Sequence, residues 1–175
     1  PGSLKANLSV NGIREMIAFC EEYQLPYDQC GKVVVATNDN EIQALDTLAA
    51  RGEKNGLLGL RYLSNEQLKK REPFVRAHKA LLVPEEGIVD YKAVMRKMVQ
   101  KIKENGGDIY YNTPISWIKE RDNSTLQIQT KEIVATFDFV ICCSGLWSDT
   151  TFTNLTNEKS PLKIIPFRGE YLKFK

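Results

Sequence analysis

The sequence has little of what metal sites, disulfide frameworks and membrane spans require. Its 175 residues include one histidine, His78, and four cysteines that form no Cys-x-x-Cys pair. A metal site is therefore not expected, and we expect the four thiols to be reduced and buried. Apolar runs extend over only a few residues, whereas a transmembrane helix needs about 20. No basic and apolar leader opens the sequence, so neither a spanning nor an exported protein is expected.

The sequence also lacks a large excess of either positive or negative residues. Lys and Arg total 24 against 22 Asp and Glu, which gives a formal net charge of +2. Such a balance produces no basic field, so nucleic acid is not an expected partner. Apolar residues at 42% and charged residues at 26% are typical of a folded globular protein.

The first two thirds of the sequence alternate between helical and extended patterns. Apolar residues at helical spacing predict a helix over 3–23, and a stripe ending near Gly52 predicts another that Asn38 or Asp39 caps. Ser64 and Gln67 have the spacing of a capping box, and Asp90 is a typical N-cap of the next helix, which Asn105 ends. Strands are predicted by β-branched or apolar runs at 32–37, 62–63 and 80–83.

The last third reads as strands. An extended segment at 109–111 is followed by the alternating segments 115–118, 126–130 and 133–137, which predict an antiparallel meander. The uninterrupted apolar run Phe139 to Cys142 predicts a strand buried on both faces of a parallel sheet. Residues 163–175 are predicted to form another extended segment. A meander between strands of a parallel sheet is an α/β (α+β) arrangement that many Rossmann-type flavoprotein domains have.

The buried run ends abruptly at Ser144-Gly145. Ligands of open α/β sheets lie beyond the carboxyl ends of the strands, where a glycine lets the backbone approach a cofactor closely. An ordinary turn from strand to helix is the alternative interpretation.

Six stretches in order along almost the whole chain belong together: residues 1–6, 30–36, 55–56 with 59–61, 87–91, 143–149 and 166–171. Taken together, they resemble the L-2-hydroxyglutarate oxidases and dehydrogenases, which are FAD-dependent members of the D-amino-acid-oxidase-like oxidoreductases.

The resemblance implies an internal fragment of a Rossmann-type FAD domain with an inserted antiparallel substrate domain. Residues 1–30 and 86–155 would belong to the FAD domain, and residues 31–85 and 160–175 to the substrate domain. The family opens with a strand and a Gly-x-Gly-x-x-Gly turn that holds the FAD pyrophosphate, and this sequence has neither. The family's catalytic histidine would precede Pro1, and His78 does not match it. No catalytic residue is therefore expected in this fragment, and His78 is expected to be a solvent-facing loop residue.

The resemblance also implies the cofactor contacts. Ser144, Gly145, Leu146 and Trp147 resemble the turn that passes beside FAD, with plain core packing as the alternative. Pro114 and Ile115 match the place where related flavoproteins offer backbone groups to the adenine, although a meander strand explains them too.

Three residues are predicted to bind substrate. Arg168 can hold a carboxylate in two hydrogen bonds, with a surface ion pair to Glu170 as the alternative. Gly169 would let the strand approach flavin or substrate closely. Tyr171 could donate a hydrogen bond or simply be a strand aromatic.

The implied reaction is the oxidation of an L-2-hydroxy acid, most specifically L-2-hydroxyglutarate to 2-oxoglutarate, with FAD as cofactor and oxygen or a quinone as electron acceptor. The fragment itself is predicted to be inactive. Two alternatives stay open, namely a glycerol-3-phosphate or amine/amino-acid oxidoreductase of the same fold and a non-catalytic α/β binding remnant. A cytoplasmic location is expected, mitochondrial in a eukaryote, with peripheral association with the inner membrane as an alternative. The sequence does not indicate an oligomeric state.

Overall fold

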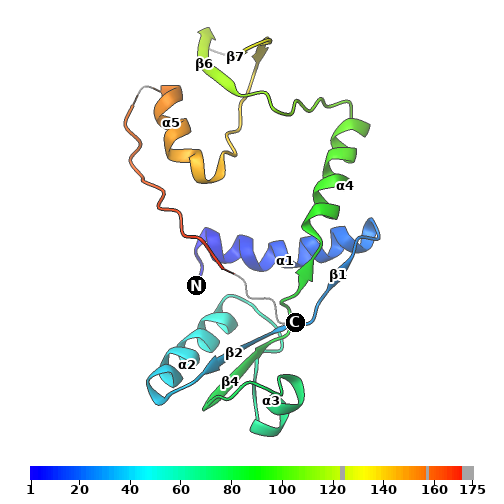
Figure 1. Cartoon of the computed structure of the whole chain (residues 1–175), viewed down its shortest axis with the longest axis vertical. Coiled ribbons are helices and arrows are strands. Elements are labelled where there is room, and N and C mark those ends of the chain that lie inside the picture. Colours follow the sequence, from blue (N-terminus) through cyan, green and yellow to red (C-terminus); the bar gives the residue numbers. More distant parts are fainter. Residues whose placement is uncertain (123–124, 157, 171–175) are drawn as a thin grey trace. The chain divides into compact units, whose positions relative to one another are not determined.

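A computed structural model describes residues 1–122, 125–156 and 158–170 (Figure 1). The chain divides into two compact units, Pro1–Asp108 and Ile109–Lys175. Each unit has its own sheet structure, so each is considered by itself.

The core of the first unit lies between a helix and a three-stranded antiparallel sheet. Strand β4 (Lys79–Val83) is central and pairs with β2 (Lys32–Ala36) and β3 (Arg61–Leu63). Helix α2 (Asp39–Lys54) places Leu45 and Ala49 against Ala36 and Leu81, and all four residues are buried. Burial of these apolar side chains stabilises the unit, because each removes apolar surface from water.

Three helix starts agree with their sequence signals. Asn38 accepts a hydrogen bond from the Glu41 amide and caps α2. Ser64 and Gln67 form the predicted capping box of α3 (Asn65–Arg71). The Asp90 carboxylate accepts from two amides at the start of α4 (Tyr91–Glu104). Each cap satisfies backbone donors that a helix start leaves without a partner.

Helix α1 and a short strand pair complete the first unit. The helix runs over Leu4–Glu22, close to the predicted range, and its Cys20 is buried. Strand β1 (Tyr27–Asp28) pairs with β5 (Ile88–Val89). The pairing brings the connection after α1 beside the turn that follows β4.

The second unit contains the predicted meander. Strands β6 (Ile115–Asp122), β7 (Thr125–Thr130) and β8 (Val134–Phe137) pair in that order, all antiparallel. A 3-10 turn over Gly145–Trp147 leads into α5 (Ser148–Thr156). The mixed α/β class predicted from the sequence is confirmed.

Three predicted extended segments are not strands. Residues 109–111 and 163–170 adopt no regular structure, and neither does the apolar run 139–142. Phe139 and Ile141 are 78% and 76% exposed, so this run is not buried. A strand buried on both faces needs paired neighbours and covering helices, and the described residues place no strand beside it.

The prediction of four buried thiols was partly wrong. The four thiols are free, but only Cys20 is buried. Cys142 and Cys143 are exposed because they lie at the end of the uncovered run and directly after it, and Cys30 is exposed beside β2.

Candidate cofactor site

The second unit contains a pocket of about 410 Å³ where the meander meets the segment before α5. The start of β6, the apolar run and α5 each contribute part of the lining. Ile115 and Ser144, both predicted to contact a cofactor, lie together in this lining although 29 positions separate them in sequence. The lining consists of Thr113, Ile115, Ser116, Ile118, Val140, Ile141, Cys142, Cys143, Ser144, Thr151, Asn154 and Leu155.

Ser144 presents an unusual polar atom to this pocket. Its hydroxyl oxygen is buried and has no hydrogen-bond partner among the described residues. Burying a hydroxyl without a partner costs free energy, so such atoms in folded proteins generally meet a ligand, an ion or water. The Ser144 carbonyl accepts a hydrogen bond from the Trp147 amide at 3.0 Å, which fixes the turn that positions this side chain.

The turn after Ser144 is held locally. Gly145 has φ of +55°, a region that other residues adopt at a cost, and its carbonyl accepts a hydrogen bond of 2.7 Å from the Ser148 hydroxyl. Leu146 and Trp147 are 66% and 70% exposed and do not line the pocket. Pro114 is exposed next to Ile115 and also lies outside the lining. The structure thus brings together two of the six predicted cofactor residues.

Asp149 connects α5 to the segment that carries Arg168. Its carboxylate accepts from the Ile164 amide at 3.0 Å and from the Thr150 amide at 2.7 Å. The hydrogen bond from Ile164, followed by the one from Thr150, lowers the pKa of Asp149. No role of Asp149 was predictable from the sequence, in which its position in the stretch after Trp147 is the one available signal.

The predicted substrate residues are not gathered in a pocket. Arg168 and Gly169 are exposed, and neither lines a described cavity. Within the described part of the chain, Arg168 forms no ion pair with Glu170, the alternative considered from the sequence. Tyr171 lies outside the described residues.

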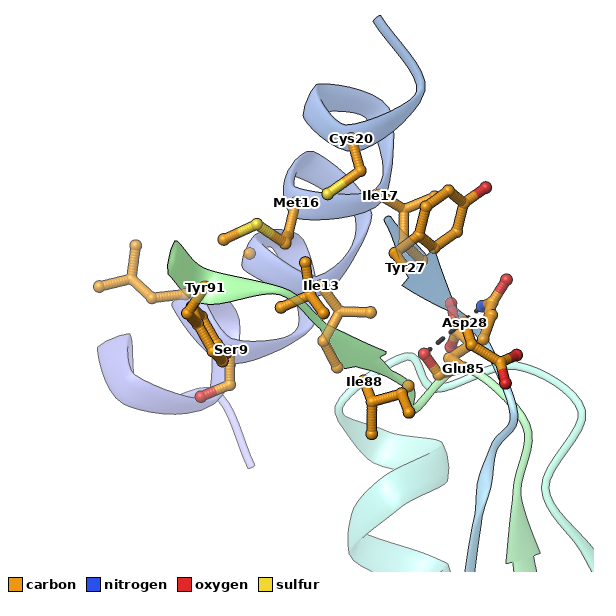
Figure 2. Close-up of a pocket in the computed structure, with 15 residues that line it drawn as sticks. Ser9, Ile13, Met16, Ile17, Cys20, Tyr27, Asp28, Glu85, Ile88 and Tyr91 are labelled. Atoms are coloured by element: carbon orange, nitrogen blue, oxygen red, sulfur yellow. Dashed lines mark hydrogen bonds between the residues drawn. The ribbon is translucent and has the colours of Figure 1, made fainter. Parts of the chain in front are cut away.

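A second pocket, of about 360 Å³, lies in the first unit between α1 and the β1–β5 pair. In Figure 2, Ile13, Met16 and Ile17 project from α1 beside the strand that carries Ile88. Asp28 and Glu85 are the acidic residues of this otherwise largely apolar lining. This pocket was not predictable from the sequence, since its walls come from segments that are far apart along the chain.

Glu85 is the most extensively bonded side chain beside this pocket. Its carboxylate accepts from Arg14 Nε at 3.0 Å and from the Leu58 amide at 2.6 Å. The hydrogen bond from Arg14, and then that from the Leu58 amide, lowers the pKa of Glu85. Arg14 also donates to the Gly56 carbonyl at 2.8 Å. From the sequence, Glu85 was simply part of a turn.

A further polar cluster lies on the sheet of the first unit. Asp46 accepts hydrogen bonds from the Tyr62 hydroxyl and from Lys79 Nζ, and the ammonium lies 4.2 Å from the centre of the Tyr62 ring. The hydrogen bond to Asp46 raises the pKa of Tyr62 to about 12. His78 is solvent-facing, as predicted, and its Nδ1 lies 2.9 Å from the Asp39 carboxylate.

The part of the chain that the structure describes has neither a metal site nor a spanning helix. The described residues contain no group of three or more His, Cys, Asp or Glu side chains that could hold a metal ion. Among the described helices, none is both long enough and apolar enough to cross a bilayer.

Sequence comparison relates the chain to flavoenzymes over its whole length. The sequence pattern of the family described as FAD dependent oxidoreductase matches residues 1–175. The L-2-hydroxyglutarate dehydrogenase of Indibacter alkaliphilus is 38% identical over 175 residues, which are 100% of this chain and 44% of the relative. The mitochondrial L-2-hydroxyglutarate dehydrogenase of Homo sapiens is 35% identical over 186 residues, which include 100% of this chain and 40% of the relative. The chain therefore spans less than half the length of these relatives.

Solved structures show the same fold at lower identity. The L-alpha-glycerophosphate oxidase of Mycoplasma pneumoniae, solved with FAD bound, superposes with a TM-score of 0.77 at 21% identity, over 89% of this chain and 42% of that one. The L-proline dehydrogenase of P. horikoshii superposes with a TM-score of 0.76 at 16% identity, over 85% of this chain and 40% of that one. With its full-length sequence match and these structural neighbours, the chain belongs to the FAD-dependent oxidoreductase family.

Proposed function

We propose that this chain is part of an FAD-dependent enzyme that oxidises an L-2-hydroxy acid, specifically L-2-hydroxyglutarate to 2-oxoglutarate. Support comes from relatives of that name, which are 38% and 35% identical over the entire chain. The fold alone would not distinguish this substrate from others, because one fold supports many chemistries. Bound FAD supplies a hydride acceptor, which protein side chains do not provide.

The observation that carries the cofactor assignment is the unpaired Ser144 hydroxyl. It is buried at the edge of a pocket that also contains Ile115, and both residues were predicted to contact FAD. A polar group of the cofactor would satisfy this atom, so the residues present fit part of FAD. The pocket of about 410 Å³ accommodates only a portion of so large a molecule. We assign Gly145, Leu146, Trp147 and Pro114 to the same cofactor surface as neighbours of these two residues.

Substitution of Ser144 tests this assignment. In the full-length protein, Ser144→Ala is expected to weaken FAD binding about 2- to 10-fold, since a lost hydrogen bond contributes about 0.5–1.5 kcal/mol. The wild-type protein is the reference. FAD dissociation constants follow from flavin fluorescence. Equal affinities of Ser144→Ala and the wild type would contradict a contact between the Ser144 hydroxyl and the cofactor.

The domain assignment extends the same proposal. Residues 1–30 and 86–155 would contribute to the cofactor side, and residues 31–85 and 160–175 to the substrate side. Arg168 is free of ion pairs in the described chain and exposed, so its guanidinium is available for a substrate carboxylate. Gly169 next to it, and Tyr171 outside the described residues, complete the proposed substrate segment.

Turnover by the full-length protein tests the reaction. L-2-hydroxyglutarate is expected to bleach the flavin absorbance without oxygen, and reoxidation by oxygen or by a quinone identifies the acceptor. Arg168→Lys keeps the positive charge but removes the planar guanidinium, which can hold a carboxylate in two hydrogen bonds. The variant should therefore raise KM for the dicarboxylate about 10-fold, equivalent to about 1.4 kcal/mol. Bleaching by glycerol 3-phosphate or glycine, but not by L-2-hydroxyglutarate, would favour the alternative substrates.

The 175-residue chain on its own is a separate case. We predict that it neither turns over L-2-hydroxyglutarate nor retains FAD stoichiometrically, because it contains no glycine-rich pyrophosphate turn. Purified chain with a bound-flavin spectrum and turnover would refute this prediction.

A further inference from the structure

Arg14 and Glu85 lie at a junction of several segments of the first unit. Arg14 is on α1, whereas Glu85 is in the turn between β4 and β5. Their ion pair measures 3.0 Å and joins positions 71 residues apart. We name the bonds made by these two side chains the Arg14–Glu85 node.

The node reaches a third segment, the loop that follows α2. Arg14 Nη2 donates to the Gly56 carbonyl at 2.8 Å, and the Leu58 amide donates to Glu85 Oε2 at 2.6 Å. The loop is thus bonded to both members of the pair. A change in either side chain would release the loop as well as the helix.

The setting makes this pair stronger than an ordinary surface salt bridge. Exposed pairs contribute little to stability, because water screens them. The Arg14 side chain is 46% exposed, but that of Glu85 is only 14% exposed, and Glu85 accepts from a backbone amide as well as from the guanidinium. The arginine fork can bond a carboxylate and a carbonyl together, which a lysine ammonium does less well.

We propose that Arg14 and Glu85 are positioning residues that fix α1 against the loop after α2 and the β4–β5 turn. This inference rests on the proposed function, in which α1 belongs to the cofactor side and residues 31–85 to the substrate side. The node then sets how substrate is aligned with flavin. Alignment matters because a misplacement of about 1 Å can cost about 100-fold in rate.

Steady-state kinetics of the full-length protein test this role. Glu85→Gln and Arg14→Lys are expected to lower kcat about 10-fold or more while flavin content stays unchanged. The double variant should be no worse than either single variant, because both changes break the same node. Glu86→Gln is the matched control, since Glu86 is on the same turn and pairs with Lys32 at 3.0 Å. Its kcat should match that of the wild type.

Two kinetic results would overturn the proposal. One is a kcat of Glu85→Gln equal to that of Glu86→Gln, and the other is a double variant whose loss is the product of the two single losses. A loss of flavin in Glu85→Gln would also contradict positioning, because it would indicate a general structural defect.

A measurement on the 175-residue chain tests the positioning role independently of the proposed reaction. Residual dipolar couplings report the orientation of α1 relative to α2 without any turnover. The couplings of α1 should change in Glu85→Gln and Arg14→Lys and stay unchanged in Glu86→Gln. If the wild-type protein fails to oxidise L-2-hydroxyglutarate, the proposed function is wrong. The couplings still test whether Arg14 and Glu85 fix the orientation of α1. Unchanged couplings in all three variants would overturn it.

Discussion

Tyr62 has a pKa well above the ordinary value of a tyrosine. Its hydroxyl donates to Asp46, and this bond raises the pKa of Tyr62 to about 12. Asp46→Asn replaces the charged acceptor with a neutral one, so the Tyr62 pKa should return towards the ordinary value of about 10. Ultraviolet titration of phenolate absorbance, with Tyr62→Phe to identify the signal, measures the change. A Tyr62 pKa that is the same in Asp46→Asn would show that the Asp46 carboxylate is not the cause.

Glu85 should make the first unit sensitive to acid. Its pKa is lowered in the folded state by Arg14 and by the Leu58 amide. A carboxylate with a lowered pKa stabilises the fold above its unfolded value, about 4.3 for glutamate, and this stability is lost as pH falls through the folded pKa. Urea unfolding should therefore show a steeper loss of stability below about pH 4.3 in the wild type than in Glu85→Gln. Identical pH profiles would rule out this contribution of Glu85.

The residues differ in how far the sequence could predict their environment. A solvent-facing His78 was predictable, because it lies between Arg76 and Lys79 in a polar loop. The bonds of Glu85 were not, because Arg14 and Leu58 are 71 and 27 positions away. A carboxylate next to a glycine turn has no sequence feature that reveals a distant arginine.

At the scale of elements, the β1–β5 pair depends on a glycine. A Cβ atom added at Gly87 would lie 2.6 Å from the Asp28 carbonyl oxygen and 3.0 Å from Gln29 Cα. Because these are backbone atoms, Gly87→Ala must shift β1, and we expect a loss of about 1–3 kcal/mol in the free energy of unfolding.

Gly12 is the matched control for this prediction. It lies inside α1, and a Cβ there would meet nothing within 4 Å. Gly12→Ala should therefore stabilise the chain by about 0.5–1 kcal/mol. Urea unfolding of both variants measures the difference, and destabilisation by Gly12→Ala or none by Gly87→Ala would contradict this account.

Local signals predicted elements better than apolar runs did. The caps at Asn38, Ser64 and Asp90 each use atoms within three residues, so the sequence alone contains the whole interaction. The run at 139–142 carries the pattern of a buried strand, yet burial depends on partners that its own residues do not supply. The apolar pattern indicates that residues 139–142 can be buried, but the described residues place no strand beside them.

At the scale of the whole molecule, the family and the mixed α/β fold were predictable, while the pockets were not. Six stretches along the chain carried the resemblance, and the match over residues 1–175 confirmed it. The cofactor residues came from the same resemblance, and only Ile115 and Ser144 are brought into one lining. Which side chains meet depends on packing between distant segments, and sequence spacing does not report that.

The division into two units predicts that residues 1–108 fold on their own. All strand pairs described in this range close within it, as does the buried cluster around Leu45 and Leu81. The Tyr62–Asp46 bond lies inside the same range, so it reports on the native fold. Chain 1–108 should therefore show a Tyr62 pKa of about 12, the value expected for the full chain.

Asp46→Asn made in chain 1–108 is the control, and its Tyr62 pKa should move towards about 10. A contrary result is a Tyr62 pKa near 10 in unsubstituted chain 1–108 and near 12 in the 175-residue chain. It would mean that the first unit depends on residues 109–175 for its fold. Cooperativity would then extend across the boundary at Asp108, and the two units would unfold together in one urea transition.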